Sequence, residues 1–405
     1  MVVKYKLLEA RGTMASKIAI TDNGKVNIPA DVLNRSGLGT GTEVVVETFD
    51  GGLMLLRAAL DARRLYLEPT SRCNLNCKTC MRNSWQETLG SMPLEAYREI
   101  LAQLRSFSAM ETIHFCGFGE PLSHGDIFEM LRLAHEHGLR TELTTNGLLL
   151  ERGVAQEIID SGVHTVVVSV DGVQPETYGD IRGADLERVI QNVAGLANLK
   201  RERGVTLPRI GLEFVAMKRN IREIPQLLRL AVSLGASFVL VTNLMPYTED
   251  LKDEILYGNG SRKWPVTLWW FWRWGSSRII LPKMQIRTER YCRFVEGASM
   301  TVAWDGGVSA CYPLMHSYPC FVLGRRKEMY RHTFGNALEE GLATIWTSPD
   351  YVRFRARVKR FDFPSCTDCS ANDACHFVQT NEADCWGNSP SCGDCLWARG
   401  LILCL

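Results

Sequence analysis

Between about residues 64 and 246 the chain alternates short apolar segments with amphipathic ones, and this repeat leaves few folds open. The apolar segments are rich in β-branched residues and are predicted to be strands at 65–70, 112–120, 140–147, 164–172, 209–217 and 237–246. Apolar residues at three- and four-residue spacing predict helices between them, for example at 93–104, 186–199 and 222–235. Strands and helices in alternation form a parallel sheet covered by helices, and such folds bind ligands at the carboxyl ends of their strands.

The fourteen cysteines are clustered rather than spread along the chain: three lie at 73–80, one at 116 and ten between 292 and 404. We expect a cytoplasmic protein, because the start lacks the apolar core of a signal peptide and no apolar run reaches the roughly 18 residues of a membrane span. Reducing compartments disfavour disulfides, so clustered cysteines there more often bind metal or take part in catalysis. The two groups predict two kinds of metal site.

Cys73, Cys77 and Cys80 follow directly on the first predicted strand with the spacing C-x3-C-x2-C. Iron in a 4Fe–4S cluster takes thiolate ligands, usually four, so three cysteines would leave one iron open. An open iron can bind the amino and carboxylate groups of a small molecule. Zinc is the alternative, but zinc sites usually pair two C-x2-C units or combine cysteine with histidine, and no histidine lies nearby in the sequence.

The triplet and its place in the repeat resemble the radical S-adenosylmethionine (SAM) superfamily over residues 65–246. The resemblance implies a partial (βα)6 barrel of the α/β class, with one 4Fe–4S cluster and SAM bound at the strand ends. The cofactor-binding residues that it implies are Gly117, Gly119, Glu120, Thr145, Asn146, Ser169, Asp171, Arg182 and Glu213.

Within this set the resemblance gives several residues a role. Glu120, in a motif similar to Gly-Gly-Glu-Pro, would bind the SAM amino group, since a carboxylate matches an ammonium. Arg182 would pair with the SAM carboxylate, and Ser169 and Asp171 would contact its ribose. Residues 243–246 would line the adenine and substrate side. Thr79 stands where many family members have an aromatic residue, so adenine stacking is not expected there.

The ten distal cysteines resemble the pattern of the SPASM domain, which binds auxiliary iron–sulfur clusters. The first part of the pattern, C-x9–15-G-x4-C, matches Cys292, Gly306 and Cys311. The second part, C-x2-C-x5-C-x3-C, matches Cys366, Cys369 and Cys375, but Gln379 stands at the position of the next cysteine.

Two auxiliary 4Fe–4S clusters would need eight ligands, and the resemblance leaves their pairing open. One cluster is assigned to Cys366, Cys369 and Cys375, completed by Cys392 or Cys395. The other is assigned to Cys292 and Cys311, with Cys320 and Cys385 as their expected partners. Zinc is an alternative for the Cys392–Cys395 pair, and Cys116 is expected to be a buried thiol.

The organisation that we predict has four parts: a β-rich domain at 1–60, the barrel at 61–246, a Trp-rich connecting segment at 247–290 and a cysteine-rich domain at 291–405. Residues 15–58 resemble the AbrB/MazE swapped-hairpin domain, which implies a homodimer through this segment or docking to a substrate protein. The net charge is +1 and the segment is not strongly basic, so DNA binding is not expected. The run WPVTLWWFWRWG is either a core patch or a wall for substrate or partner.

The radical SAM resemblance implies an enzyme in which SAM is cleaved to a 5′-deoxyadenosyl radical. The start of the chain, CNLNCKTCMR and DCWGNSPSCGDCLWARG further resemble the maturases of tungsten-containing aldehyde ferredoxin oxidoreductases. This likeness implies that the substrate is such an oxidoreductase or its tungstopterin cofactor, with a ferredoxin or flavodoxin as electron donor. Two alternatives stay open: an enzyme that installs thioether or carbon–carbon crosslinks in a peptide, and a DNA-binding iron–sulfur regulator.

Overall fold

A computed structural model of the chain describes residues 25–49, 52–258, 260 and 278–404. The chain divides into two compact units, Met1–Ala59 and Leu60–Leu405. The run at 264–275 and residues 15–24 lie outside the described residues. None of the helices in the described part of the chain combines the length and the hydropathy that a membrane span requires.

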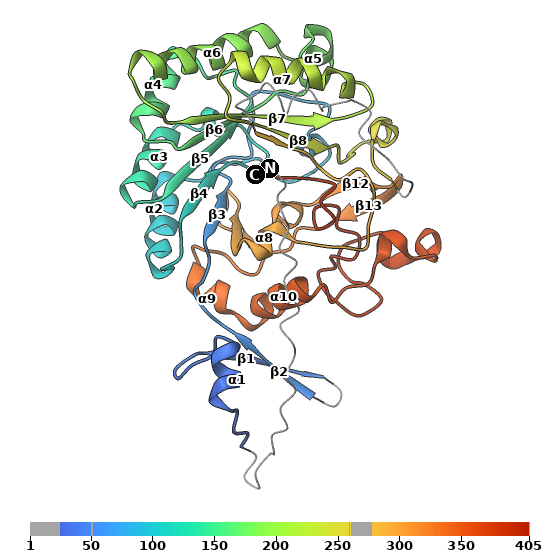
Figure 1. Ribbon diagram of the computed structural model, residues 1–405. Helices are drawn as coiled ribbons and strands as arrows, with labels where there is room; N and C mark the ends of the chain where they lie inside the picture. The colour runs from blue at the N-terminus through green and yellow to red at the C-terminus, as the bar shows by residue number, and fades with distance from the viewer. Residues whose placement is uncertain (1–24, 50–51, 259, 261–277, 405) are drawn as a thin grey trace. The chain divides into compact units, whose positions relative to one another are not determined.

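The larger unit is built on a parallel sheet in which the six predicted strands follow one another in chain order (Figure 1). These strands are β3 (Arg64–Leu67), β4 (Thr112–Phe115), β5 (Arg140–Thr145), β6 (Thr165–Ser169), β7 (Arg209–Ala216) and β8 (Phe238–Asn243). Every residue of β4 and β8 is buried, as expected for strands covered on both faces. The prediction of a partial (βα)6 barrel is confirmed.

Three further strands extend this sheet at its two edges. β9 (Arg278–Ile280) pairs in parallel with β8, while β10 (Ser299–Val302) pairs in parallel with β3 and carries β11 (Val308–Ser309) antiparallel to itself. The sheet therefore has nine strands, and both edges of the barrel are continued by later parts of the chain.

Helices cover the outer face of the six central strands (Figure 1). They are α2 (Leu94–Gln103), α3 (Ile127–Glu136), α4 (Arg152–Asp160), α5 (Pro175–Arg182), α6 (Leu186–Glu202) and α7 (Ile224–Ser233). Each buries one apolar stripe; α7, for example, buries Ile224, Leu227, Leu228 and Ala231. The inner side of the strand ends is thereby left for ligands.

The cysteine-rich region packs onto the same hydrophobic core as the barrel, through residues such as Met300, Trp346 and Tyr351. Its regular elements are α8 (Arg293–Glu296), the hairpin β12 (Tyr318–Val322) and β13 (Arg325–Met329), α9 (Leu342–Thr347) and α10 (Pro349–Arg360). Beyond α10 the chain forms short 3-10 turns, which hold Cys366, Cys369 and Cys375.

The smaller unit contains α1 (Ala30–Arg35) and an antiparallel hairpin of β1 (Val44–Phe49) and β2 (Gly52–Arg57). Val44, Val46 and Leu53 of this hairpin are exposed, and α1 has no buried residue. A two-stranded hairpin with so little buried apolar surface is marginal alone, so the described part of this unit needs a further apolar partner.

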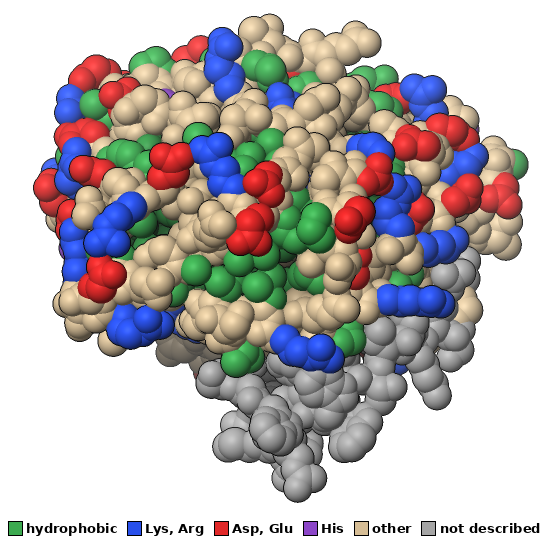
Figure 2. Space-filling model, turned by 90° about the horizontal axis from the view of Figure 1, so that it is seen from above, with side chains coloured by type: hydrophobic (Ala, Val, Ile, Leu, Met, Phe, Trp, Pro, Cys, Tyr) green, Lys and Arg blue, Asp and Glu red, His purple; other side chains and the backbone are tan. Residues whose placement is uncertain are grey.

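Charge is mixed on the face seen in Figure 2, where Lys and Arg side chains lie among Asp and Glu and apolar side chains show between them.

Candidate functional site

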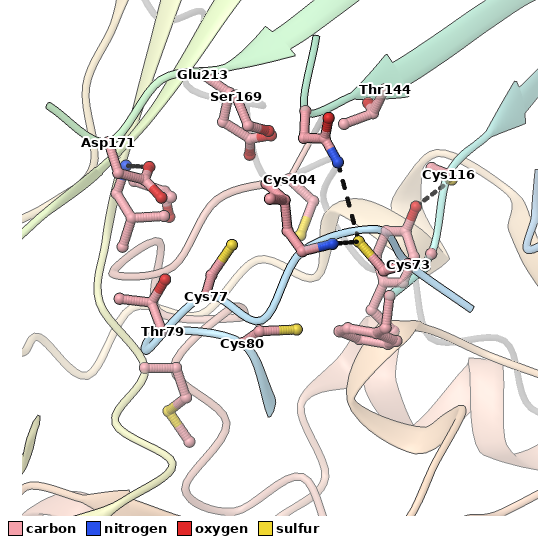
Figure 3. A pocket seen from close by; sticks show the side chains of 18 of the residues that line it. Cys73, Cys77, Thr79, Cys80, Cys116, Thr144, Ser169, Asp171, Glu213 and Cys404 are labelled. Carbon is pink, nitrogen blue, oxygen red and sulfur yellow. Dashed lines mark hydrogen bonds between the residues drawn. The ribbon is translucent and has the colours of Figure 1, made fainter. Parts of the chain in front are cut away.

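A cavity of about 300 Å³ lies at the carboxyl ends of the barrel strands (Figure 3). Parallel strands in register bring their carboxyl ends to one edge, so residues far apart in the sequence meet there. Every one of the nine predicted cofactor-binding residues lines this cavity, as do the three cysteines of the triplet.

The triplet lies on the loop between β3 and α2, and polar contacts fix the path of this loop. The Lys78 N–H donates to Ile181 O at 2.8 Å, and Asn83 Nδ2 donates to Cys77 O at 2.8 Å. The Leu75 N–H donates to Cys73 Sγ at 3.4 Å, the kind of hydrogen bond that a thiolate ligand accepts. Burial raises the pKa of Cys73, and it raises that of Cys77 to about 11, so these thiols need a bound cation to ionise at neutral pH.

Glu120 is buried at the end of the second barrel strand and is held by three donors. Its carboxylate accepts from Thr145 Oγ1 at 2.7 Å, from the Asn146 N–H at 2.7 Å and from the Leu122 N–H at 3.0 Å. Burial raises its pKa, and these hydrogen bonds oppose the rise. Thr145 and Asn146 thus position Glu120 in the cavity wall.

Gly117 and Gly119 are required by close packing of the backbone. A Cβ at Gly119 would lie 2.0 Å from Thr70 O, and one at Gly117 would lie 2.6 Å from Glu68 Cγ, with Gly117 also at φ +113°. These glycines let the segment that carries Glu120 lie against the start of the cysteine loop.

Asp171 and Arg182 form a buried ion pair, with Arg182 Nη2 2.8 Å and Nε 2.9 Å from Asp171 Oδ2. The other oxygen of Asp171 accepts from the Val215 N–H at 2.9 Å. Asp171 therefore orients Arg182 and links it to β7. The family resemblance had instead implied that Asp171 contacts the ribose of SAM.

Ser169 and Glu213 are paired in register on β6 and β7. Burial raises the pKa of Glu213 to about 7, the negative charge of Asp171 adds to the rise, and a hydrogen bond with Ser169 opposes it. Glu213 can therefore exchange a proton near neutral pH, a property that the sequence did not reveal.

Asn243 lines the cavity, as expected for residues 243–246, and the cavity is completed by side chains that were not predicted as site residues: His114, Cys116, Tyr312, Trp397 and Cys404. Cys116 is buried, as expected. Tyr312 and Trp397 follow Cys311 and Cys395 closely in the sequence, and this proximity was the only available signal.

Four of the distal cysteines line one apolar cavity: Cys292, Cys311, Cys392 and Cys395. Burial is the main cause that raises the pKa of each of these four thiols. For Cys292, Cys311 and Cys392, the charges of neighbouring sulfurs in the group raise the pKa further. The predicted pairing placed Cys320 and Cys385 beside Cys292 and Cys311; the structure places Cys392 and Cys395 there.

Cys366, Cys369 and Cys375 lie at the ends of successive short 3-10 turns. Burial raises the pKa of Cys366 to about 12, the negative charge of Asp394 adds to the rise, and the charge of Lys327 opposes it. Cys320 is buried in another apolar cluster, with Met81 and Met245.

The described residues contain no three His, Cys, Asp or Glu side chains close enough to share a single metal ion. The triplet and the set Cys292, Cys311, Cys392 and Cys395 are grouped more loosely, each around a cavity. Sets of three or four thiols around a common space match the thiolate ligands of an iron–sulfur cluster.

A buried clamp joins the cysteine loop to the cysteine-rich region. His316 lies 2.9 Å from Glu68 Oε2 through Nε2 and 2.6 Å from Glu87 Oε2 through Nδ1. Hydrogen bonds and the charges of the two carboxylates overcome burial and raise the pKa of His316 to about 9. Because Glu68 directly follows β3 and Glu87 follows the triplet, the clamp fixes this loop from both sides.

Comparison with known proteins agrees with this geometry. Residues 67–245 match the model of the radical SAM superfamily, and residues 292–370 match that of an iron–sulfur cluster-binding domain, SPASM. A tungsten-containing aldehyde ferredoxin oxidoreductase cofactor-modifying protein from Pyrococcus furiosus is 37% identical over 342 residues, which cover 84% of this chain and 96% of the relative.

Two further similarities are more distant. An Fe-coproporphyrin III synthase from Methanosarcina barkeri is 26% identical over 365 residues, covering 80% of this chain and 86% of that protein. The crystal structure of Streptococcus suis SuiB bound to S-adenosylmethionine superposes with a TM-score of 0.56 at 18% identity, over 79% of this chain and 73% of SuiB, and shows the fold alone.

The barrel therefore binds SAM and a 4Fe–4S cluster, and the cysteine-rich region binds auxiliary iron–sulfur clusters. The triplet, the anchored carboxylate of Glu120 and the oriented guanidinium of Arg182 fit these groups by their donor chemistry. The chain belongs to the radical SAM superfamily, as a modifying maturase of the SPASM type.

Proposed function

We propose that this enzyme modifies a tungsten-containing oxidoreductase of the aldehyde ferredoxin type, or its tungstopterin cofactor. The observation that carries the proposal is the 37% identity to the cofactor-modifying protein of P. furiosus across 96% of that relative. A protein substrate would also suit an enzyme whose smaller unit exposes Val44, Val46 and Leu53.

At the SAM site, we assign the cluster to Cys73, Cys77 and Cys80. When bound, SAM supplies a 5′-deoxyadenosyl radical after its reductive cleavage. Glu120, fixed by Thr145 and Asn146, accepts the ammonium of SAM, and the glycines at 117 and 119 allow its close approach. Arg182, oriented by Asp171, pairs with the carboxylate.

The remaining residues of the cavity act on the ribose and on protons. Ser169 and Glu213 line the cavity and would hold the ribose of SAM, whose hydroxyls would donate to the Glu213 carboxylate. With its pKa near 7, Glu213 can also hold a proton during the reaction.

For the auxiliary sites, we propose two 4Fe–4S clusters. One is held by Cys292, Cys311, Cys392 and Cys395, which line one cavity. The other is held by Cys366, Cys369, Cys375 and Cys385. In this assignment Cys320 is not a ligand but a buried thiol of the β12–β13 hairpin, which differs from the ligand role expected from the sequence.

We further propose a low-potential protein such as a ferredoxin or flavodoxin as electron donor. A second copy of the chain, paired through residues 15–58, would cover the exposed apolar residues of the hairpin.

The test is reconstitution with the intended substrate. The reduced, iron-loaded enzyme is incubated anaerobically with SAM and a tungsten oxidoreductase purified from cells that lack this enzyme. We expect a SAM-dependent mass change in the oxidoreductase or its cofactor, absent when Cys73, Cys77 and Cys80 are replaced by Ala. An unchanged oxidoreductase beside continuing 5′-deoxyadenosine formation would contradict the assigned substrate and favour a peptide.

A further inference from the structure

Two thiols line the SAM cavity without a place in the assignments above, Cys116 and Cys404. The two thiols differ in whether their S–H groups donate a hydrogen bond. Cys116 donates its S–H to His114 O at 3.1 Å and accepts from the Tyr312 hydroxyl. Cys404 accepts from Trp397 Nε1 at 3.2 Å, and its own S–H has no acceptor among the described residues.

The segment that carries Cys404 is anchored at the end of β8. Asn243 Nδ2 donates to Leu401 O at 2.9 Å, and the Leu403 N–H donates to Thr242 Oγ1 at 2.8 Å. These bonds fix the segment beside the barrel opening, so the Cys404 side chain lies among the SAM-site residues (Figure 3).

Burial raises the pKa of Cys404 to about 12, with the charge of Glu213 adding to it and the Trp397 hydrogen bond opposing it. The sulfur therefore carries its hydrogen at neutral pH. Because an S–H bond is weaker than an aliphatic C–H bond, a carbon-centred radical in this cavity can take that hydrogen.

An independent feature indicates that a ligand other than the chain itself occupies this side of the cavity. Asn243 is 1% exposed and lines the cavity, and both hydrogen bonds of its Nδ2 go to backbone carbonyls. Its Oδ1 has no hydrogen-bond partner among the described residues. A buried acceptor without a partner is costly unless a bound molecule donates to it.

Trp397 connects Cys404 with the four-cysteine cavity. Trp397 lines both cavities, and its indole N–H donates to the Cys404 sulfur. Trp397 follows two residues after Cys395, one of the four cysteines, so a single residue borders both cavities.

We propose that Cys404 is the hydrogen-atom donor of this cavity, and that Trp397 carries the electron that restores it. This inference rests on the proposed radical function. The S–H bond of Cys404 breaks as a C–H bond forms on the substrate radical, which leaves a thiyl radical. Restoring the thiol takes one electron and one proton: a reduced iron–sulfur cluster held by the four cysteines would supply the electron through Trp397, and solvent would supply the proton.

The test uses the full-length, iron-loaded enzyme with SAM and dithionite in D2O, without substrate. The Cys404 thiol exchanges to S–D, and the 5′-deoxyadenosyl radical takes this atom. We expect 5′-deoxyadenosine with one deuterium, measured by mass spectrometry. In Cys404→Ser the product loses this label, because an O–D bond is too strong to donate; in the matched variant Cys116→Ser the label stays.

Several results would overturn the proposal. Unlabelled product from the wild type, or label retained in Cys404→Ser, would show that the thiol does not meet the radical. Loss of one cluster's iron in Cys404→Ser would make Cys404 a ligand instead. If the iron-loaded wild type forms no 5′-deoxyadenosine at all, the proposed function fails, and the inference fails with it. That outcome differs from a failure of the inference alone, in which the product forms but carries no deuterium.

The role of Trp397 has its own readout. Trp397→Phe keeps an aromatic ring but removes the indole N–H. We expect its labelled product to stop after the first turnover, while the wild type continues to make it. Continued labelling by Trp397→Phe at the wild-type yield per chain would rule out the electron path through this residue.

Discussion

At the scale of single residues, the SAM site depends on a few groups that cannot be exchanged. Glu120 has three donors that hold its carboxylate in the cavity wall, and Arg182 has an ion pair with Asp171 that sets its direction. Both charged groups are buried, where an ill-placed charge is expensive and a well-placed one binds its counter-ion strongly.

Gly119→Ala tests the close packing behind Glu120. The added Cβ would lie 2.0 Å from Thr70 O and 2.6 Å from Arg72 O, both backbone atoms that cannot move aside cheaply. We expect strain of about 1–3 kcal/mol and a loss of SAM affinity of about tenfold or more, measured by equilibrium binding. Gly125→Ala, where a Cβ meets nothing within 4 Å, is the control, and equal affinities for the two variants would contradict this reading.

Glu120→Gln tests the charge itself. The amide keeps the size of the side chain but cannot pair with an ammonium as a carboxylate does. The loss of one charge-assisted hydrogen bond should weaken SAM binding by about 1.5–3 kcal/mol. Binding within a factor of two of the wild type would remove Glu120 from the SAM site.

At the scale of elements, the His316 clamp joins the loop after β3 to the cysteine-rich region. The pKa of His316 is raised from 6.5 to about 9, so its stabilisation is complete below about pH 6.5 and is lost as the pH rises through 9. The pKa of Glu87 is lowered: burial alone would raise it, but hydrogen bonds from His316 and Ser317 outweigh burial. The stabilisation that the Glu87 carboxylate contributes is therefore lost on acidification.

The clamp predicts a specific pH dependence. A shift of this size corresponds to about 3 kcal/mol at most, since each unit is worth about 1.4 kcal/mol. His316→Gln should lower the unfolding temperature at pH 7, and the difference from the wild type should shrink by pH 10. A difference that stays constant across this range would show that the imidazolium contributes nothing.

Elements also show what the sequence could and could not predict. The six barrel strands were predictable because each is a buried apolar run, as in β8, and the strand-end residues follow from their order. β9 and β10 were not predicted, because strands of three or four residues show little periodicity. Their register is set by pairing with β8 and β3, the edge strands of the barrel, and this pairing cannot be read from the local sequence. The partners of Cys311 and His316 were missed for a similar reason: they are far away in the sequence and meet only in the folded chain.

At the scale of the whole molecule, the radical site is shared between two parts of the larger unit. The strands contribute the SAM contacts, while Tyr312, Trp397 and Cys404 arrive from the cysteine-rich region and close the same cavity. The common core joins the two parts, so the auxiliary cysteines are held at a fixed place beside the radical site.

Iron content tests this arrangement. With three 4Fe–4S clusters the chain should hold about twelve irons, and Cys311→Ala should lose about four of them. Cys320→Ala is the matched control, because its buried sulfur lies in a different apolar cluster and its loss should leave the iron content intact. Loss of a cluster from Cys320→Ala, with Cys311→Ala unaffected, would reverse the assignment.

The most direct measurement of the whole account is 5′-deoxyadenosine formation by the anaerobically reconstituted, reduced protein with SAM. The account predicts that the product forms, and that replacing Cys73, Cys77 and Cys80 with Ala abolishes it while the auxiliary iron stays bound. A protein with full iron that leaves SAM intact, or a triplet variant that still cleaves it, would contradict the account.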